Sequence, residues 1–417
     1  MPSLSVTEIC RAARAAARKL AAASGAARAA FLAGLARGLE AGAGAILAEN
    51  QKDVKAARAA GRSPAFLDRL ALDEKRLAGL ARGVGEVAAL PDPLGEVLET
   101  VRRADGLVIE KVRVPIGVVA LIYESRPTVT IEAAALCLKA GNACVLRGGR
   151  ESARSNRALH AALQGALEKA GLPAGAAGLV AGGGRAEVGE LLRQREFLDL
   201  VIPRGGEDLV RRVVEESRIP VIKHYKGVCH AFVDEGADLD LAEKVCLNAK
   251  VQRPGTCNAL ECLLVHRAEA PGFLPRLAQA MARHEVELRG CPESRRLVPG
   301  MKPAAPSDWG AEFLDLVLAV KVVGSLAEAV EHIARFGSGH SDAILTRDKG
   351  RAEEFARLVD SAAVFINCST RLHDGGQFGM GAEIGISTDK LHARGPMALP
   401  ELTSYTYIVY GDGQVRE

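Results

Sequence analysis

The sequence has little net charge, no cysteine pairs at metal-binding spacing and no long uninterrupted apolar run. Its formal charge is only +3 over 417 residues, which gives no indication of a nucleic-acid partner or an anionic membrane surface. The longest apolar stretches reach a charged residue before they are long enough to span a membrane. With 48% hydrophobic and 25% charged residues, the composition is typical of a soluble globular protein.

The nine cysteines are odd in number and irregular in spacing. Because there is no CxxC pair and no Cys/His cluster at zinc spacing, we expect no metal site. Free thiols in a reducing cytoplasm are the simplest interpretation of this pattern.

The beginning of the sequence is rich in Arg and Ala, a composition that transit peptides share. The pattern continues through residues 46–61, however, where acidic residues are interleaved with it. We therefore expect amphipathic helices of the mature protein in this region.

The pattern of apolar residues predicts α/β domains after a helical beginning. A length of 417 residues favours two or three domains, and residues up to about 90 are helical in character. From residue 115 onward, buried strands alternate with helices, which predicts a parallel, doubly wound sheet with ligands at the carboxyl ends of its strands. A second α/β run begins near residue 228.

Two segments outside these runs alternate as β-strands do. Residues 95–115 have apolar residues on both sides of Ala-Asp-Gly, which predicts a hairpin. An isolated hairpin is marginally stable in water, so we expect it to join another sheet. The C-terminal segment 402–413 alternates again and is the candidate partner.

Arg-Gly-Gly follows two of the predicted strands, at Arg147, Gly148 and Gly149 and again at Arg204, Gly205 and Gly206. Glycine lets a ligand approach the backbone closely, and the following helix offers N–H groups to a phosphate. The arginine guanidinium can add two charged hydrogen bonds. Two ordinary turns with solvated arginines are the alternative. Because both Arg-Gly-Gly segments follow strands of one predicted sheet, nucleotide binding and ordinary turns both remain as interpretations. No GxGxxG fingerprint is present.

The segment QRPGTCNALE places Cys257 on a Pro-Gly turn, before a run that we expect to be helical. Helix N-termini and nearby cations favour the reactive thiolate form, so Cys257 is a candidate nucleophile. A chance surface cysteine is the alternative. Cys262, inside the following apolar run, is expected to lie in the core.

Two glycine-containing loops carry further polar residues. The segment 336–344 holds a histidine that could transfer protons or only bond its neighbours. The segment 367–385 is rich in Gly, Ser, Thr and Arg, a composition typical of loops that hold polar substrates. A plain surface connection is the competing interpretation of the second loop.

Several of these segments together resemble the γ-glutamyl phosphate reductase family of the aldehyde dehydrogenase superfamily. The similar segments are VPIGVVALIYESRPTVTIEAAALCLKAGNACVLRGG, QRPGTCNALE, AVEHIARFGSGHSDAI and DKLHARGPMALPELTSYTYIVYGDG. The resemblance extends from the first helices to the last strand. It implies a Rossmann-type cofactor domain (1–93 and 115–225, with part of 385–400), a catalytic α/β domain (226–384) and a β-hairpin oligomerisation extension (94–114 and 401–414).

The resemblance also implies a reaction. It is the NADPH-dependent reduction of L-glutamyl 5-phosphate to L-glutamate 5-semialdehyde and phosphate through a cysteine thioester, the second step of proline biosynthesis. A homo-oligomer and a functional link to glutamate 5-kinase are implied as well. The alternatives are another thiol-dependent aldehyde dehydrogenase or acyl-phosphate reductase, or a nucleotide-binding module without catalysis.

By the same resemblance, Cys257 is the nucleophile, and its own N–H is a candidate oxyanion donor beside Asn258. Ser125 stands where wider relatives carry an asparagine donor. The implied cofactor contacts are Arg147, for a 2′-phosphate, and Glu312, for the nicotinamide ribose. As substrate contacts we expect Arg126 and, from the glycine-rich loop, Ser369 and Arg371 for the substrate carboxylate.

One departure from aldehyde-oxidising relatives concerns the segment HYKGVCH, residues 224–230. Those relatives carry a glutamate that activates water here, whereas this chain has His224 or Tyr225 near the equivalent place. The resemblance therefore implies that phosphate, rather than water, is the partner of the thioester.

Overall fold

The computed structural model of the chain describes residues 4–181 and 184–416. The chain divides into two units, each with its own parallel sheet. The first unit comprises Met1–Lys223, Gly379–Gly385 and Met397–Glu417, and the second comprises His224–Phe378 and Ile386–Pro396.

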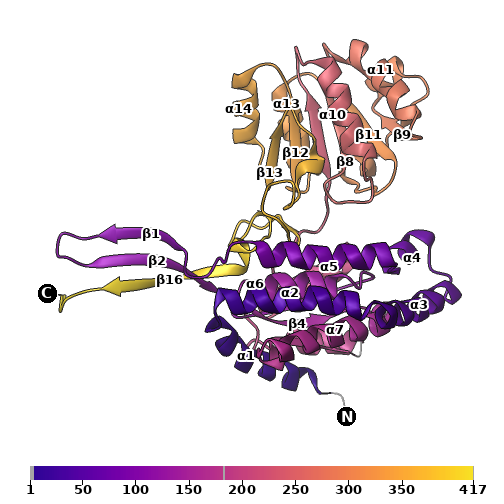
Figure 1. The fold of residues 1–417 in the computed structure, drawn as a ribbon. Helices are drawn as coiled ribbons and strands as arrows, with labels where there is room; N and C mark the ends of the chain where they lie inside the picture. The colour runs from indigo at the N-terminus through magenta and orange to yellow at the C-terminus, as the bar shows by residue number, and fades with distance from the viewer. Residues whose placement is uncertain (1–3, 182–183, 417) are drawn as a thin grey trace. The chain divides into compact units, whose positions relative to one another are not determined.

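The first unit begins with the expected helices, coloured indigo in Figure 1. Four of the five start where a serine or aspartate side chain accepts an otherwise unpaired backbone N–H, as Ser24 and Asp73 do, whereas α3 follows Gly42 without such a bond. Among the described residues no single helix is both long and apolar enough to cross a membrane, whereas α2 and α3 together meet that test with a 68° bend. The five helices are α1 (Val6–Ala21), α2 (Gly25–Ala41), α3 (Ala43–Ala59), α4 (Pro64–Leu70) and α5 (Glu74–Ala89).

The sheet of the first unit has the order β5-β4-β3-β6 and is parallel throughout. Its central strand, β3, is buried along its whole length, which is why it reads as a continuous apolar run. Because the chain moves outward from β3 to β5 and then returns to β6, the strand order reverses between β3 and β6, where such sheets bind ligands. The strands are β3 (Val118–Tyr123), β4 (Ala143–Arg147), β5 (Ala177–Leu179) and β6 (Leu200–Arg204); the helices between and after them are α6 (Val129–Lys139), α7 (Ala153–Lys169), α8 (Arg185–Leu191) and α9 (Glu207–Glu216).

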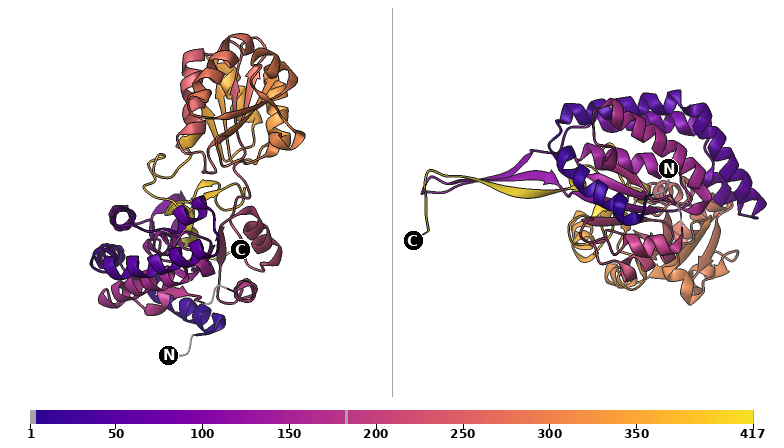
Figure 2. Two further views of the ribbon diagram at one scale, coloured as in Figure 1. Left: turned by 90° about the vertical axis from the view of Figure 1, so that its right-hand side faces the viewer. Right: turned by 90° about the horizontal axis from the view of Figure 1, so that it is seen from below.

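A three-stranded antiparallel sheet extends from the first unit as a long ribbon (Figures 1 and 2). The hairpin of β1 (Val97–Arg102) and β2 (Val108–Pro115) pairs with the C-terminal β16 (Thr403–Tyr410) in the order β1-β2-β16. The expected pairing of the hairpin with the tail is therefore formed.

The second unit contains a seven-stranded sheet in the order β10-β9-β11-β8-β7-β12-β13, again parallel. Helices α10 and α11 pack on one face, and α13 and α14 pack on the other (Figure 1). The strands are β7 (Cys229–Val233), β8 (Leu260–His266), β9 (Glu287–Gly290), β10 (Lys302–Pro303), β11 (Val317–Val323), β12 (Ser341–Leu345) and β13 (Ala363–Ile366). The helices are α10 (Leu239–Val251), α11 (Ala270–Ala282), α12 (Pro292–Leu297), α13 (Leu326–Phe336) and α14 (Lys349–Leu358).

The run after Cys257 is a strand, and the expectation of a helix there was wrong. Residues Leu260–His266 form β8, which lies between β7 and β11. A short apolar run is compatible with either a buried helix or a buried strand, and the two neighbouring strands decide the outcome. Cys257 therefore does not gain thiolate character from a helix N-terminus.

Candidate active site

Cys257 lies on a tightly held turn at the amino end of β8 and is half-buried. A Cβ added to Gly227 would fall 1.8 Å from the carbonyl oxygen of Cys257, so only glycine fits beside this turn. The Cys229 thiol donates to the same oxygen at 3.2 Å. The Gly227 N–H donates to Oε1 of Glu312 at 2.8 Å, which ties the neighbouring backbone in place.

The glycine-rich loop is bonded directly to the nucleophile turn through Asn258. The Asn258 amide donates to the carbonyl of His373 at 3.0 Å, and its carbonyl oxygen accepts from Thr256 and from Arg371. Thr370 donates to the Asn258 backbone oxygen at 2.8 Å. Both ends of the Asn258 side chain are therefore engaged, which gives this residue a positioning role.

Arg371 brings a positive charge to the same place. Its Nε donates to Gln252 at 2.8 Å, and its own backbone N–H donates to the Ser369 hydroxyl at 3.3 Å. Burial lowers the pKa of the Arg371 guanidinium, and negative charge at Asp374 and at Cys257 opposes that shift. Arg371 is bonded to the Asn258 side chain, next in sequence to Cys257, and a cation near a cysteine favours its thiolate form.

Two histidines flank Cys257. One ring nitrogen each of His224 and His340 lies within 4.8 Å of the Cys257 sulfur and of one another. His340 belongs to a buried series of hydrogen-bonded side chains. Its Nδ1 lies 2.7 Å from the Ser341 hydroxyl, and that hydroxyl lies 2.7 Å from Nδ1 of His373. Burial holds the pKa of His340 well below its usual range and lowers that of His373 to about 4. Both rings are therefore neutral at pH 7.

The carboxylate next to the nucleophile turn is not a water-activating base. Glu261, on β8, is fully buried and accepts from Lys250 Nζ at 2.7 Å through one oxygen and from the Leu314 N–H at 3.1 Å through the other. Burial raises the pKa of Glu261 to about 7, against the opposing effect of Lys250. With both oxygens bonded, this carboxyl group has a structural role.

The two Arg-Gly-Gly segments predicted to bind the cofactor lie at the carboxyl ends of strands in the first unit, whereas Glu312 lies in the second unit. Arg147, at the end of β4, is buried, and its Nη2 donates to the Gly184 carbonyl at 2.9 Å. Its buried Nε has no hydrogen-bond partner among the described residues. Burial lowers the pKa of the Arg147 guanidinium, and the negative charges of Glu187, Glu151 and Glu124 oppose that shift. Packing explains Gly148 and Gly149, since an added Cβ would fall 2.1 Å from the side chains of Asn156 and Glu151, respectively.

The second Arg-Gly-Gly segment lies beside the reversal point of the same sheet. Arg204 packs against Gly385, and Gly205 has no room for a Cβ beside Glu124. Gly206 faces open space at the start of α9, which has no side-chain cap. Glu207 and Asp208 stand in the first turn of that helix and offset its positive end, which leaves Arg147 as the stronger anion candidate.

Ser125 and Arg126 follow β3 in the first unit. Ser125 has a φ of 56°, a backbone conformation that costs energy for a serine and is often found at functional sites. Its N–H donates to Glu151 at 2.8 Å and its hydroxyl donates to the same oxygen at 3.4 Å. Arg126 is exposed.

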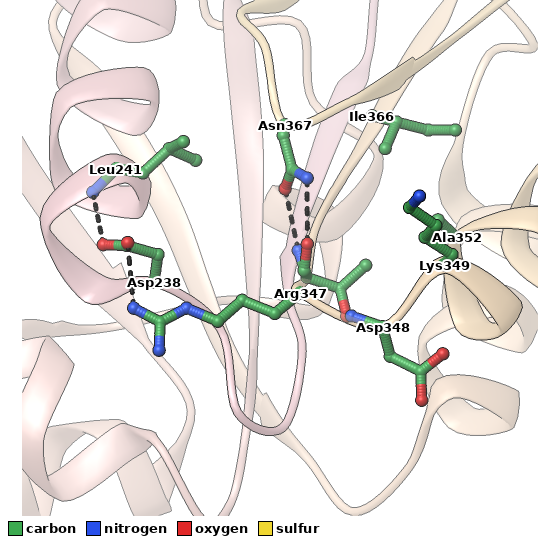
Figure 3. A pocket seen from close by; sticks show the side chains of 9 residues that line it. Asp238, Leu241, Arg347, Asp348, Lys349, Ala352, Ile366 and Asn367 are labelled. Atoms are coloured by element: carbon green, nitrogen blue, oxygen red, sulfur yellow. Dashed lines mark hydrogen bonds and ion pairs between the residues drawn. The ribbon is translucent and has the colours of Figure 1, made fainter.

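A hollow of about 300 Å³ lies at the opposite, carboxyl edge of the second sheet, beside the ends of β12 and β13 (Figure 3). Two of its charged groups are bonded to each other, since Asp238 pairs with Arg347 at 2.9 Å, and Asp238 also caps α10. Asn367 bonds both the N–H and the carbonyl of Thr346. No cysteine or histidine is among the described residues that line it.

The fold and the cysteine site define a class of enzyme, and the comparisons agree with it. The chain belongs to the aldehyde dehydrogenase family, whose model (Aldehyde dehydrogenase family) matches residues 3–291. Within that class it is similar to γ-glutamyl phosphate reductases. It is 55% identical to the enzyme of Carboxydothermus hydrogenoformans over 371 residues, 89% of each chain. It is 52% identical to that of Geotalea daltonii over 412 residues, 99% of each chain.

Among solved structures, the chain is similar to γ-glutamyl phosphate reductase from Thermotoga maritima. The TM-score is 0.97 at 45% identity, over 99% of this chain and 100% of the other. The resemblance and the fold class inferred from the sequence are therefore confirmed. The family uses nicotinamide cofactors, and this chain is an oxidoreductase of that family.

Proposed function

We propose that the chain catalyses the NADPH-dependent reduction of L-glutamyl 5-phosphate to L-glutamate 5-semialdehyde and phosphate, the second step of proline biosynthesis. The observation that carries the proposal is the rigid, half-buried Cys257 turn beside the Arg371 guanidinium. The γ-glutamyl phosphate reductases that are 52–55% identical support the substrate. Glutamate 5-kinase would then supply the acyl phosphate.

In this mechanism the Cys257 thiolate attacks the acyl carbon, and the C–O bond to phosphate breaks with its electrons leaving on phosphate. The product of this step is a thioester on Cys257. The developing oxyanion would be stabilised by the Cys257 N–H, with Ser125 as the proposed side-chain donor. Arg126, Ser369 and Arg371 are proposed to hold the substrate carboxylate. Bound NADPH would supply the hydride that takes the thioester to the aldehyde level, after which the C–S bond breaks and the thiolate is regenerated.

The direct test is oxidation of NADPH with enzymatically generated glutamyl phosphate, compared with acetyl phosphate at equal concentration. We expect turnover with glutamyl phosphate and little with acetyl phosphate, because the proposed carboxylate contacts would be unused. Equal rates would favour a general acyl-phosphate reductase. Binding of NADPH without any turnover, and without alkylation of Cys257, would favour a nucleotide-binding module.

The proposed cofactor residues are the two Arg-Gly-Gly segments, Arg147 to Gly149 and Arg204 to Gly206, together with Glu312 for the nicotinamide ribose. The preference for NADPH is assigned to Arg147. Its guanidinium stands at the carboxyl end of β4, and a guanidinium suits the charge and geometry of a 2′-phosphate.

We therefore predict that Arg147→Ala weakens the binding of NADPH far more than the binding of NADH. A charge-assisted hydrogen bond is worth about 1.5–3 kcal/mol, so we expect about a ten- to hundredfold rise in the Kd for NADPH. Fluorescence titration with both cofactors measures this, and Arg204→Ala is the matched control at the neighbouring strand end. Equal losses for the two cofactors in Arg147→Ala, with a selective loss in Arg204→Ala, would move the phosphate site to Arg204.

We further propose that the chain forms a homo-oligomer through the ribbon of β1, β2 and β16. This sheet exposes both of its edge strands, and large apolar or aromatic side chains on β16 are exposed, including Tyr407, Ile408 and Val409. Such strands are ready partners for another chain.

Accordingly, Ile408→Asp should convert the oligomer to a monomer, because it places a charge in the proposed contact between the ribbon and another subunit. Light scattering after size-exclusion chromatography measures the mass. Val415→Asp adds the same charge at an exposed position beyond β16 and should leave the mass unchanged. A monomeric wild-type protein, or an Ile408→Asp protein of unchanged mass, would contradict the proposal.

A further inference from the structure

The three groups around the nucleophile are all strong ligands for soft metal ions. His224, Cys257 and His340 each present one donor atom, and the three atoms lie within 4.8 Å of one another. His224 and Cys257 are half-buried, whereas His340 is fully buried. Spacing along the chain does not reveal this group, because its members come from three segments separated by 33 and 83 residues, far from any zinc-finger spacing.

A hydrogen bond at one nitrogen of each ring fixes the orientation of the two histidines. Nδ1 of His224 lies 2.8 Å from the Ile386 carbonyl, which can only accept, so this nitrogen carries the proton and Nε2 carries the lone pair. Nδ1 of His340 is bonded to the Ser341 hydroxyl at 2.7 Å. Nε2 of His340 is buried and has no hydrogen-bond partner among the described residues. Anchoring of the remote nitrogen to a carbonyl or hydroxyl is the usual arrangement around metal-binding histidines.

A second group with similar donors consists of His230, Cys262 and His332. His230 is anchored like His340, since its Nδ1 lies 3.2 Å from Asp342 and its buried Nε2 has no hydrogen-bond partner among the described residues, but the group differs in its burial and at His332. All three residues are buried within the second unit, which leaves no route for an ion. Nδ1 of His332 faces Lys321 Nζ at 3.3 Å, and its Nε2 lies 3.6 Å from the Cys262 sulfur. Because the ammonium group requires Nδ1 to accept, Nε2 carries the proton and points it at sulfur. Within that group the His332 and Cys262 side chains are bonded to each other, and the group serves as the comparison.

We propose that His224, Cys257 and His340 form a binding site for a thiophilic divalent cation, of the class of Zn²⁺, and that the ion blocks the nucleophile when it is bound. Zinc takes sulfur at about 2.3 Å and nitrogen at about 2.0–2.1 Å, so the three atoms need to approach by about 1 Å to surround it. A water molecule would fill the fourth position. Binding replaces the S–H bond of Cys257 by an S–metal bond and releases the proton.

This inference goes beyond the proposed reaction, which uses the metal-free thiolate. Its inhibitory consequence rests on the proposed role of Cys257, whereas ion binding itself does not. Ion binding and the protection of the Cys257 thiol from alkylation can both be measured without substrate. Failure of the metal site and failure of the proposed reaction therefore give different results.

The first measurement uses Co²⁺ as a spectroscopic probe on the reduced, metal-stripped full-length protein. We expect one equivalent to produce a saturable thiolate-to-cobalt charge-transfer band in the near ultraviolet, and Zn²⁺ to remove it. The band should be absent in Cys257→Ser and unchanged in Cys262→Ser. In His340→Gln the affinity should fall about tenfold or more, as expected for loss of a ligand. Circular dichroism establishes that each variant is folded.

The second measurement needs no variant. Iodoacetamide labelling followed by mass spectrometry should show that Zn²⁺ protects Cys257 at least about tenfold and that a chelator reverses the protection, whereas the half-buried Cys291 and Cys368 are unaffected. The proposal is overturned by the absence of a saturable cobalt band, by a band that persists in Cys257→Ser, by one that disappears in Cys262→Ser, or by equal protection of all three thiols.

Discussion

Cys257→Ala should lower turnover by about a thousandfold or more, because removal of the attacking nucleophile leaves only binding and electrostatic contributions to the rate. The side chain is half-buried on a turn, and the bonds that hold the turn are made by its backbone and by Asn258. We therefore expect an unchanged Kd for NADPH and a free energy of unfolding within about 1 kcal/mol of wild type. The measurements are NADPH oxidation with glutamyl phosphate, cofactor titration and thermal unfolding.

The matched control is Cys262→Ala, five residues further along the same segment. Cys262 is fully buried in β8 and packs in the core of the second unit. Its truncation leaves a small cavity, so it should cost about 1–2 kcal/mol of stability and leave kcat within a fewfold of wild type. Turnover by Cys257→Ala at more than about a tenth of the wild-type rate would rule out the thioester mechanism.

The sequence predicts most of the architecture because its local signals agree with the tertiary environment. Asp73 caps α5, β3 is a continuous apolar run at the centre of its sheet, and Ala-Asp-Gly turns the β1–β2 hairpin. In each case the local pattern and the burial of the element favour the same conformation. The segment Leu260–His266 is different, because a short apolar run has no periodicity of its own and only the pairing of β8 with β7 and β11 makes it a strand.

The site was less predictable than the fold, since its geometry depends on contacts distant in sequence. The rule that ligands lie at carboxyl ends of parallel strands describes the places of Arg147 and Arg204, but Cys257 lies at the amino end of β8. Gly227 is one of 44 glycines, and nothing local shows that it alone must fit against the Cys257 carbonyl. The His340–Ser341–His373 chain likewise forms only when β12 and the glycine-rich loop meet.

In the reverse direction, release of the Cys257 thioester should require inorganic phosphate. With the semialdehyde and NADP but without phosphate, we expect a burst of about one NADPH per active site and then no further production. The reason is that hydrolysis needs a base placed to activate water. Glu261, the carboxylate on the adjoining strand, has both oxygens bonded to Lys250 and to a backbone N–H, and Glu312 accepts the Gly227 N–H.

Addition of phosphate should restore continuous NADPH production, and arsenate should replace it, because either oxyanion can attack the thioester directly. Stopped-flow absorbance in a phosphate-free buffer separates the burst from the steady state, and Cys257→Ala should show no burst at all. Sustained production without either anion would mean that water is activated in this site. His224, whose ring nitrogen lies within 4.8 Å of the sulfur, would then be the base. In that case His224→Gln should abolish the steady rate but keep the burst, and the chain would be a hydrolytic aldehyde dehydrogenase instead of an acyl-phosphate reductase.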